Sequence, residues 1–323
     1  MKKTLRTSGL TLLGLSISFF TGLANAAIPS ELKLDYAYYA PTSLVVKEQK
    51  LLEKALPKTK IKWVFSQGSN RSLEYLNSGS TDFASTAGLA AVLSRANGSP
   101  IKTVYIQSQP EWTALVVNKD SNIKSLKDLK GKKIAATKGT DPFLFTLQAL
   151  DTIGLGKRDV ELVHLQHPDG KTALERKQVD AWAGLDPLMA SAQAQSGAKL
   201  LYRNVSFNSY SVLSVKDQFA KSSPEAIEAV IKAYEQARQW AKANPDKLAE
   251  LLAREAKLPI EVAKLQLSRT NLDQNIPTTK HTGALQKAGR ILTEEELVRK
   301  GTNVNQVVTQ LFDARYAKKV VTK

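Results

Sequence analysis

One pattern occurs twice in this chain: a short apolar strand, a turn of small residues, and the start of a helix. One copy runs over residues 179–188, where Asp186-Pro187 is typical of a helix start, with aspartate as N-cap and proline first in the helix. Such a turn exposes backbone N–H groups, which can hold an anion. Trp182 lies beside the turn in the sequence, and we expect it to cover whatever binds there.

The other copy lies earlier, over residues 76–88, where the turn falls on residues 85–88. Asp82 takes the place of Asp180 in this comparison, and an earlier strand at Leu34 matches one at Ile134. The two copies indicate two lobes of similar plan, each directing a helix-start turn at a shared cleft.

Apolar strands alternate with helical stretches over most of the chain, which predicts a largely parallel α/β sheet in each lobe. The chain crosses between the lobes near Trp112 and near Tyr210. The predicted class is therefore α/β, with two lobes joined by two crossing segments around a ligand cleft. Lobe 1 is expected to comprise residues 27–112 and 213–323, and lobe 2 residues 113–212. Ligands of such sheets bind where the strands end, so the lobes can close on one like a clamp.

Residues 1–26 have the pattern of a secretory signal peptide. A basic start precedes an apolar run over residues 10–20, and Ala24-Asn25-Ala26 has the small-residue cleavage pattern. The apolar run is too short to span a membrane comfortably. The sequence therefore predicts export, with cleavage after Ala26, and a soluble protein in a bacterial periplasm.

Composition narrows the function further. The sequence holds no cysteine, which excludes disulfides, a lipid anchor on cysteine, thiolate metal sites and thiol nucleophiles. Cleavage would leave 323 − 26 = 297 residues and lower the net charge from +16 to 16 − 3 = +13. The lysines are scattered, without the cluster of arginines and aromatic residues typical of nucleic-acid binding. We expect no nucleic-acid partner, and modest electrostatic steering of anions.

No enzyme motif stands out. The three histidines are His164, His167 and His281, and the first two are spaced across a strand end rather than along a helix face. No third metal ligand is evident, and neither a nucleophile elbow nor a phosphate loop nor a dinucleotide fingerprint occurs. We therefore expect neither catalysis, nor a metal, nor a cofactor.

Several stretches resemble a known family. These are the Asp-Leu-Lys-Gly-Lys-Lys-Ile-Ala run at residues 128–135, Lys138-Gly139, the Val-Asp-Ala-Trp-Ala run at residues 179–183, and Asp186-Pro187. They resemble the periplasmic substrate-binding proteins of the nitrate, sulfonate and taurine importers, most closely the aliphatic-sulfonate-binding branch. The resemblance covers essentially the whole chain after residue 26. It implies a type II periplasmic binding fold, a monomer, one small ligand, and delivery to an ATP-driven (ABC) permease in the inner membrane.

The resemblance also implies a set of pocket residues. Hydroxyl and backbone N–H groups would hold the sulfonate oxygens, while Trp182 and the tyrosines would cover the apolar part of the ligand. The set is Tyr38, Tyr39, Gln67, Gly68, Ser85, Thr86, Gly88, Thr113, Gly139, Thr140, Asp141, Trp182 and Asp186.

Several of these residues have a second interpretation. Asp141 and Asp186 are expected first as helix N-caps, and Trp182 could belong to the core. Only one of Tyr38 and Tyr39 is expected to meet the ligand, because neighbours on an extended chain point to opposite faces. Arg71 and Arg269 are candidate counter-ions, with a surface role favoured for each.

Two departures from the family pattern leave the ligand open. Asp141-Pro142 interrupts the serine or threonine run usual in the sulfonate branch, and the first turn, over residues 36–41, is bulky. A carboxylate would repel a sulfonate unless the ligand also carries an amine. Taurine, an aromatic or zwitterionic sulfonate, a sulfate ester, nitrate and a thiamine-precursor-like nitrogen compound are the alternatives. An exported enzyme is less favoured, because thiamine-pyrimidine synthases of this fold lack an export signal.

Overall fold

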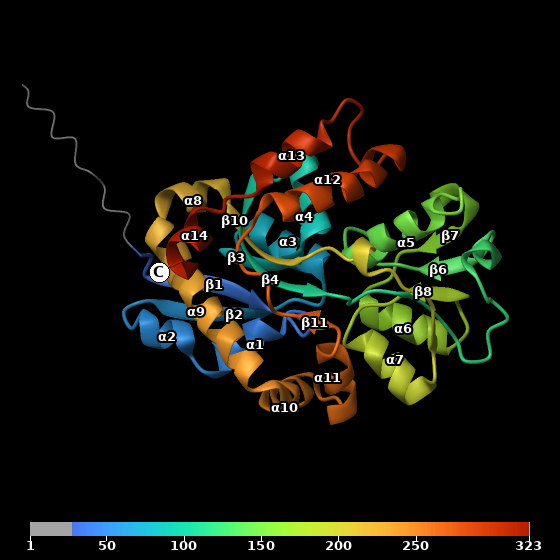
Figure 1. The fold of residues 1–323 in the computed structure, drawn as a ribbon, viewed down its shortest axis with the longest axis horizontal. Helices are drawn as coiled ribbons and strands as arrows, with labels where there is room; N and C mark the ends of the chain where they lie inside the picture. The colour runs from blue at the N-terminus through green and yellow to red at the C-terminus, as the bar shows by residue number, and fades with distance from the viewer. Residues whose placement is uncertain (1–27, 323) are drawn as a thin grey trace, which may run out of the picture.

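The computed structural model describes residues 28–322. The expected signal peptide and its cleavage site lie outside the described residues. Figure 1 shows two α/β lobes side by side, each built around one sheet, with helices α8 to α14 gathered around the lobe that contains β1. Two sheets flanked by helices agree with the expected fold class.

Lobe 1 contains a six-stranded sheet in the order β11-β4-β10-β3-β1-β2. Strand β1 pairs in parallel with β2 and β3, whereas β10 is antiparallel to β3 and β4. The strands are β1 (Glu31–Tyr36), β2 (Lys60–Phe65), β3 (Phe83–Ala87), β4 (Ile101–Pro110), β10 (Ser211–Lys216) and β11 (Thr270–Asn271).

Lobe 2 contains a five-stranded sheet in the order β7-β6-β8-β5-β9. Strand β6 pairs in parallel with β7 and β8, whereas β5 is antiparallel to β8 and β9. The strands are β5 (Leu115–Val117), β6 (Lys133–Ala135), β7 (Glu161–Val163), β8 (Ala181–Ala183) and β9 (Lys199–Tyr202).

The two sheets share one plan, because β2-β1-β3-β10-β4 corresponds to β7-β6-β8-β5-β9. Both sheets are mixed, but in this shared plan the other four strands of each sheet run in the same direction, so the expectation of largely parallel sheets holds for all strands except β10, β5 and the edge strand β11. The antiparallel strands β10 and β5 are those that follow a crossing from the other lobe. They enter their sheet at the end where its parallel strands finish, and must therefore run in the opposite direction. The boundaries placed between the lobes stay a prediction.

Asp82 and Asp180 confirm the repeat seen in the sequence. The Oδ2 atom of Asp82 accepts a hydrogen bond from the backbone N–H of Lys33 at 2.8 Å, and Oδ2 of Asp180 accepts one from Lys133 at 2.8 Å. The N–H groups of Asp82 and Asp180 donate to the carbonyls of the same lysines, at 2.7 and 2.9 Å. Each aspartate thus joins the loop before its strand to the neighbouring parallel strand.

Helices flank both sheets, and the C-terminal ones extend lobe 1. Helix α9 buries Ile227, Val230, Ile231 and Tyr234 along one face. No helix in the described part of the chain is both long and apolar enough to cross a membrane. The helices are α1 (Pro41–Glu48), α2 (Leu51–Ala55), α3 (Ser69–Ser78), α4 (Gly88–Ala96), α5 (Asp141–Asp151), α6 (His167–Glu175), α7 (Leu188–Ser196), α8 (Asp217–Ser222), α9 (Pro224–Ala243), α10 (Pro245–Ala256), α11 (Ile260–Leu267), α12 (Thr279–Glu294), α13 (Val304–Leu311) and α14 (Arg315–Val321).

Three local expectations differ from the structure. Strand β3 extends to Ala87, so Ser85 and Thr86 lie in the strand rather than in a turn. Helix α5 has Thr140 as its N-cap and helix α7 has Pro187, so neither aspartate occupies the N-cap position. Oδ1 of Asp186 nevertheless accepts a hydrogen bond from the N–H of Ala190 in the first turn of α7, so it caps that helix from one position further out. Asp141 makes other contacts, which are described below.

Candidate functional site

Six helices begin at the strand ends that border the cleft, three from each lobe. They are α1, α3 and α4 in lobe 1 and α5, α6 and α7 in lobe 2. In none of the six does the side chain of the N-cap residue bond to the first turn. The first N–H groups of a helix have no partner within the helix and carry partial positive charge. The arrangement can therefore hold an anion between the lobes.

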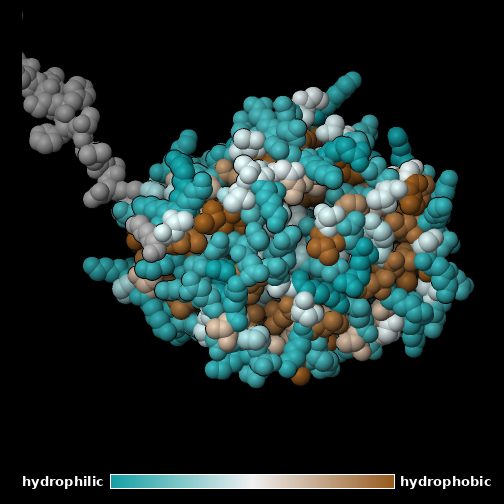
Figure 2. All heavy atoms as spheres, in the orientation of Figure 1, coloured by the Kyte–Doolittle hydropathy of each residue, from teal (hydrophilic) through white to brown (hydrophobic). Residues whose placement is uncertain are grey.

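Contacts between the lobes show that these helix starts meet. The imidazole of His167, the first residue of α6, lies against Gly68, the N-cap of α3. The amide of Asn70 in α3 donates to Gln166 at 3.4 Å. Figure 2, in the orientation of Figure 1, shows hydrophilic residues over most of the surface and apolar residues in separate patches.

Three hydroxyl groups near the cleft are fully buried. Ser66 follows β2, Thr86 lies near the end of β3, and Thr113 lies in the first crossing, each with 0% of its surface exposed. None of the three oxygens has a hydrogen-bond partner among the described residues. A buried polar group without a partner costs about 1–3 kcal/mol, so a ligand that supplied partners would recover that energy.

His167 is buried in the same region and stays neutral. Thr137 Oγ1 donates its only proton to the carbonyl of Leu165 at 2.7 Å, so it can only accept from Nδ1 of His167, at 3.1 Å. The Nε2 atom is then the unprotonated nitrogen, and it has no partner within the described residues. Desolvation by burial lowers the pKa of His167 to about 3. The unprotonated Nε2 can therefore only accept a hydrogen bond, and the imidazole carries no charge.

Asp141 joins lobe 2 to both crossing segments. Its Oδ2 accepts hydrogen bonds from the backbone N–H of Ser209 at 2.8 Å and from Nε1 of Trp112 at 3.1 Å, and its Oδ1 accepts from Ser209 Oγ at 2.9 Å. Ser209 Oγ in turn accepts from the N–H of Leu89, at the start of α4. Desolvation raises the pKa of Asp141 to about 6, although the bonds from Ser209 and Trp112 oppose that rise.

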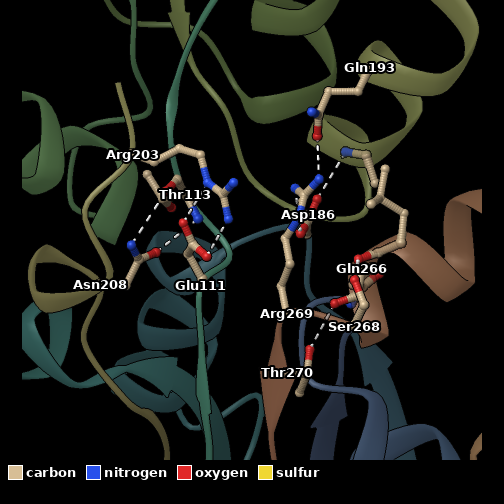
Figure 3. A network of polar contacts seen from close by, with 12 residues as sticks. Glu111, Thr113, Asp186, Gln193, Arg203, Asn208, Gln266, Ser268, Arg269 and Thr270 are labelled. Atoms are coloured by element: carbon tan, nitrogen blue, oxygen red, sulfur yellow. Dashed lines mark hydrogen bonds and ion pairs between the residues drawn. The ribbon is translucent and has the colours of Figure 1, made fainter. Parts of the chain in front are cut away.

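Asp186 and Arg269 form an ion pair between the lobes. Nη1 of Arg269 lies 3.4 Å from Oδ2 of Asp186, and Nη2 donates to Gln193 in helix α7 (Figure 3). Oδ1 of Asp186 accepts from the N–H of Ala190 at 2.9 Å. Desolvation raises the pKa of Asp186 to about 7, and Arg269 opposes the rise. The Arg269 side chain is only 8% exposed, so the surface role favoured for it was wrong.

The two crossing segments are also bonded to each other, as Figure 3 shows. Glu111 accepts two hydrogen bonds from Arg203, at 2.8 and 2.7 Å. The N–H of Thr113 donates to Oδ1 of Asn208 at 2.8 Å. These bonds make the two segments a paired hinge.

A cavity of about 180 Å³ lies between the lobes. Its lining includes four of the expected site residues, namely Tyr38, Tyr39, Gln67 and Asp186. The other lining residues are Phe65, Ser66, Pro168, Leu185, Pro187, Leu188, Ala256 and Leu258.

Trp182 lies elsewhere. It is 1% exposed and belongs to an apolar cluster of lobe 2 that also contains Val116, Leu174 and Met189. A Cβ atom at Gly170 in α6 would lie 2.8 Å from the indole, so the glycine makes room for the ring. The structure therefore places Trp182 in the core behind β8 and not in the lining of the cavity.

The other candidates from lobe 1 line the strand ends. The hydroxyl of Tyr39 donates to the carbonyl of Ser85 at 2.9 Å, and Oγ of Ser85 accepts from Gln107 at 3.0 Å. The N–H of Gly88 donates to the carbonyl of Tyr210 at 2.8 Å, so it is not free for a ligand.

The loop before α5 supplies the lobe 2 candidates Gly139 and Thr140. Gly139 adopts φ +79°, a conformation that favours glycine, and lies beside Asn70 of lobe 1. Thr140 Oγ1 donates to the carbonyl of Thr137 at 2.6 Å and so fixes this turn.

The sequence reasoning missed Ser66 and His167 as candidates for the site. Ser66 directly follows a predicted strand, and that position could have identified it. His167 was considered only as a metal ligand. Within the described residues, no group of three metal-binding side chains is placed to hold an ion.

Two α/β lobes that meet across a cleft and share a paired hinge define the periplasmic binding protein fold. The chain belongs to the NMT1/THI5-like family, whose profile matches residues 60–248. It is 29% identical over 299 residues to a protein of Escherichia coli (strain K12) named for the binding of aliphatic sulfonates, a match that covers 92% of this chain and 93% of the relative.

Solved structures support the fold. The alkanesulfonate-binding protein SsuA from Xanthomonas axonopodis pv. citri, bound to MOPS, superposes with a TM-score of 0.81 at 25% identity, covering 87% of this chain and 98% of that one. The desulfurization enzyme DSZB superposes with a TM-score of 0.66 at 17% identity, covering 91% and 99%. The second match concerns the fold alone, and shows that an enzyme can share it.

Proposed function

We propose that this protein is the periplasmic solute-binding component of an ABC importer and that it captures a small sulfonate between its lobes. The observation that carries the proposal is that helices from both lobes begin at one cleft, which also holds buried hydroxyl groups without partners among the described residues. The first N–H groups of α4 and α7 are bonded within the protein, so the helix donors for a ligand would come from α1, α3, α5 and α6. A sulfonate carries one negative charge on three oxygens that only accept hydrogen bonds. Helix N–H groups and hydroxyls supply the donors that such a group needs.

The two aspartates near the cleft do not count against an anion. Asp141 is occupied by Ser209 and Trp112, and Asp186 by Arg269 and the N–H of Ala190. The negative charge of each carboxylate is therefore stabilised by groups of the protein itself. The ligand does not need an amine to offset them, so simple sulfonates are compatible with the site.

The proposed mechanism is hinge closure without chemistry. The ligand binds one lobe through its exposed helix N-termini, the second lobe closes on it, and the closed form docks on the membrane permease. His167 stays neutral at physiological pH and Asp141 is held in the hinge, so neither is placed to exchange a proton with a ligand. The state of these two side chains supports a protein that binds its ligand without catalysing a reaction.

The proposal includes export and a monomer. A basic start, an apolar run and a small-residue cleavage pattern support a signal peptide over residues 1–26, and delivery to an inner-membrane permease requires a periplasmic protein. The net charge of 16 − 3 = +13 after cleavage supports the attraction of anions towards the protein.

A thermal-unfolding screen tests the proposal. The mature protein would be heated with methanesulfonate, benzenesulfonate, taurine, a sulfate ester, nitrate, bicarbonate or an aminopyrimidine. A ligand at a hundred times its Kd stabilises the native state by about 2.7 kcal/mol. We expect sulfonates to raise the melting temperature, and calorimetry to give a stoichiometry of one. A rise with nitrate or the aminopyrimidine and none with any sulfonate would overturn the sulfonate proposal.

A further inference from the structure

Although most lysines of the chain are scattered, five of them lie in one short segment of lobe 2. Residues 124–133 lead into strand β6, and we call them the basic segment. They contain one acidic residue, Asp128, so the basic segment carries a charge of 5 − 1 = +4. All five lysines are exposed. They are Lys124, Lys127, Lys130, Lys132 and Lys133.

The fold holds the basic segment in place and turns its lysines outward. The short 3₁₀ helix η1 (Leu126–Leu129) lies within it, and Leu126 and Leu129 are buried, with 8% and 0% of their surface exposed. Oδ2 of Asp128 accepts hydrogen bonds from the N–H groups of Lys124 and Ser125, both at 2.9 Å. With the leucines anchored in the lobe, the lysines between them face the solvent.

The positive charge of the basic segment is not neutralised locally. In the described part of the chain only Lys133 of the five forms an ion pair, with Glu161 at 3.7 Å, and both side chains are more than half exposed. The neighbouring residues 157–161 are bonded to the segment through the N–H of Gly131 and the carbonyl of Asp159 at 2.7 Å. They add two basic and two acidic residues, so the local excess of +4 remains.

The basic segment lies at the outer end of lobe 2. Strands β6, β7 and β8 are parallel, and the helices that border the cleft begin after these strands end. The residues before β6 therefore lie at the opposite end of the sheet, on the side of lobe 2 away from lobe 1 (Figure 1). A contact made there needs no closure of the lobes and leaves the cleft free.

The chemistry of the segment favours an extended surface of negative charge. It contains neither an arginine nor an aromatic residue, which planar or stacked recognition of nucleic acids would favour. The exposed large apolar side chains of residues 28–322 are Val205 and Ile260, both outside the segment, so nothing in it would insert among apolar groups. Lysine ammonium groups without a shaped pocket attract anionic groups with little demand on geometry.

We propose that the basic segment binds the anionic headgroups of a lipid membrane, with its ammonium groups against the phosphates. The inference goes beyond the proposed function and does not depend on which ligand the cleft takes. Clusters of four to eight basic residues are typical of such surfaces, and each residue near the membrane contributes about fivefold to binding. Without an apolar anchor, the association is reversible and is screened by salt.

The experiment is co-sedimentation of the mature wild-type protein with vesicles of phosphatidylcholine, either alone or with about one third phosphatidylglycerol. We expect binding only to the vesicles that contain phosphatidylglycerol. Binding should weaken at least tenfold as the salt rises from about 0.01 to about 0.15 M, because the Debye length falls from about 30 to about 8 Å. No binding to the anionic vesicles at low salt would overturn the proposal.

A triple variant locates the contact. Lys124→Gln, Lys127→Gln and Lys130→Gln together should weaken binding to the anionic vesicles at least tenfold and leave the melting temperature near that of the wild type. The matched control is Lys58→Gln, Lys247→Gln and Lys300→Gln, which removes the same charge from exposed positions spread over lobe 1. It should bind within threefold of the wild type. Equal losses in the two triple variants would show that net charge alone attracts the vesicles, and would contradict a localised surface.

A soluble acidic polymer tests the other class of partner. If the wild type binds polyglutamate and no anionic vesicle, the basic segment meets an acidic protein and the lipid proposal is wrong. Titration with sulfonates is a separate measurement. If no sulfonate binds the cleft, the proposed function fails, whereas the vesicle results still decide whether the basic segment binds lipid.

Discussion

Arg269 of lobe 1 and Asp186 of lobe 2 form an ion pair that is buried between the lobes, at 3.4 Å and with side chains 8% and 1% exposed. Removing one partner of a buried pair leaves an uncompensated charge, which is far more costly than losing an exposed pair. The pair therefore favours the closed form only while both members are present.

Arg269→Gln should weaken ligand binding at least tenfold at pH 8, because closure would bury the Asp186 carboxylate alone. The loss should shrink as the pH falls from 8, because the pKa of Asp186 is already raised to about 7 by burial, Arg269 lowers it, and a protonated Asp186 needs no cationic partner. Titration calorimetry between pH 5.5 and 8 measures this. Arg254→Gln is the matched control, since the Arg254–Glu48 pair lies within lobe 1 and the Arg254 side chain is 57% exposed. Similar losses in both variants at every pH would contradict a role for Arg269 in closure.

Gly68→Ala should impede closure. A Cβ at Gly68 would lie 2.7 Å from Nε2 of His167, and the φ of −179° allows alanine without backbone strain. We expect a loss of affinity of about tenfold, with little change in the melting temperature of the free protein.

The double variant with His167→Ala tests the contact itself. If the clash is the cause, Gly68→Ala should cost much less in the His167→Ala background, a coupling that a double-mutant cycle detects. Gly283→Ala, where no atom lies within 4 Å of the new Cβ, is the control. Fully additive effects would rule out the clash.

Trp182→Ala should lower stability rather than remove a ligand contact. The indole is 1% exposed, and truncating such a ring typically costs about 3–5 kcal/mol. Urea unfolding of the ligand-free protein measures the loss, and titration of the folded fraction should show affinity within a few-fold of wild type. Unchanged stability with abolished binding would instead return Trp182 to the site.

Asp141→Asn should change how stability depends on pH. The pKa of Asp141 in the folded protein is about 6, above the ordinary value of 3.8, because burial disfavours the carboxylate. The native state then binds a proton more tightly than the unfolded state between these pH values. The free energy of unfolding should therefore fall as the pH rises from about 4 to about 6, by roughly 3 kcal/mol from this one group.

Urea unfolding of the ligand-free protein between pH 4 and 8 checks this prediction. In Asp141→Asn the free energy of unfolding should decrease less as the pH rises. Part of the decrease should remain, because Asp35 is also buried, with its pKa raised to about 6, and still titrates. An unchanged slope in Asp141→Asn would show that Asp141 titrates normally.

The sequence by itself determined the plan of the fold. Local periodicity and turn residues predict the strands and helices, and the matched positions of Asp82 and Asp180 predict the repeat that their equivalent bonds confirm. The crossings were expected near Trp112 and Tyr210, and the chain does pass between the sheets after β4 and before β10. These features depend on interactions between residues that are close together in the sequence, so local sequence patterns predict them.

Only the tertiary structure decided how individual side chains are used. Strand β8 is three residues long and buried on both faces, so no alternation in the sequence shows towards which side Trp182 points. Asp141 meets Ser209 at a separation of 68 positions, and Asp186 meets Arg269 at 83. Contacts at such separations are set by how the lobes pack and close, and no local pattern encodes them. The sequence therefore predicts that helices begin around a cleft. The packing of the two lobes decides that Asp141 bonds the hinge segments, that Asp186 pairs across the closed lobes, and that the cavity is lined mostly by apolar groups.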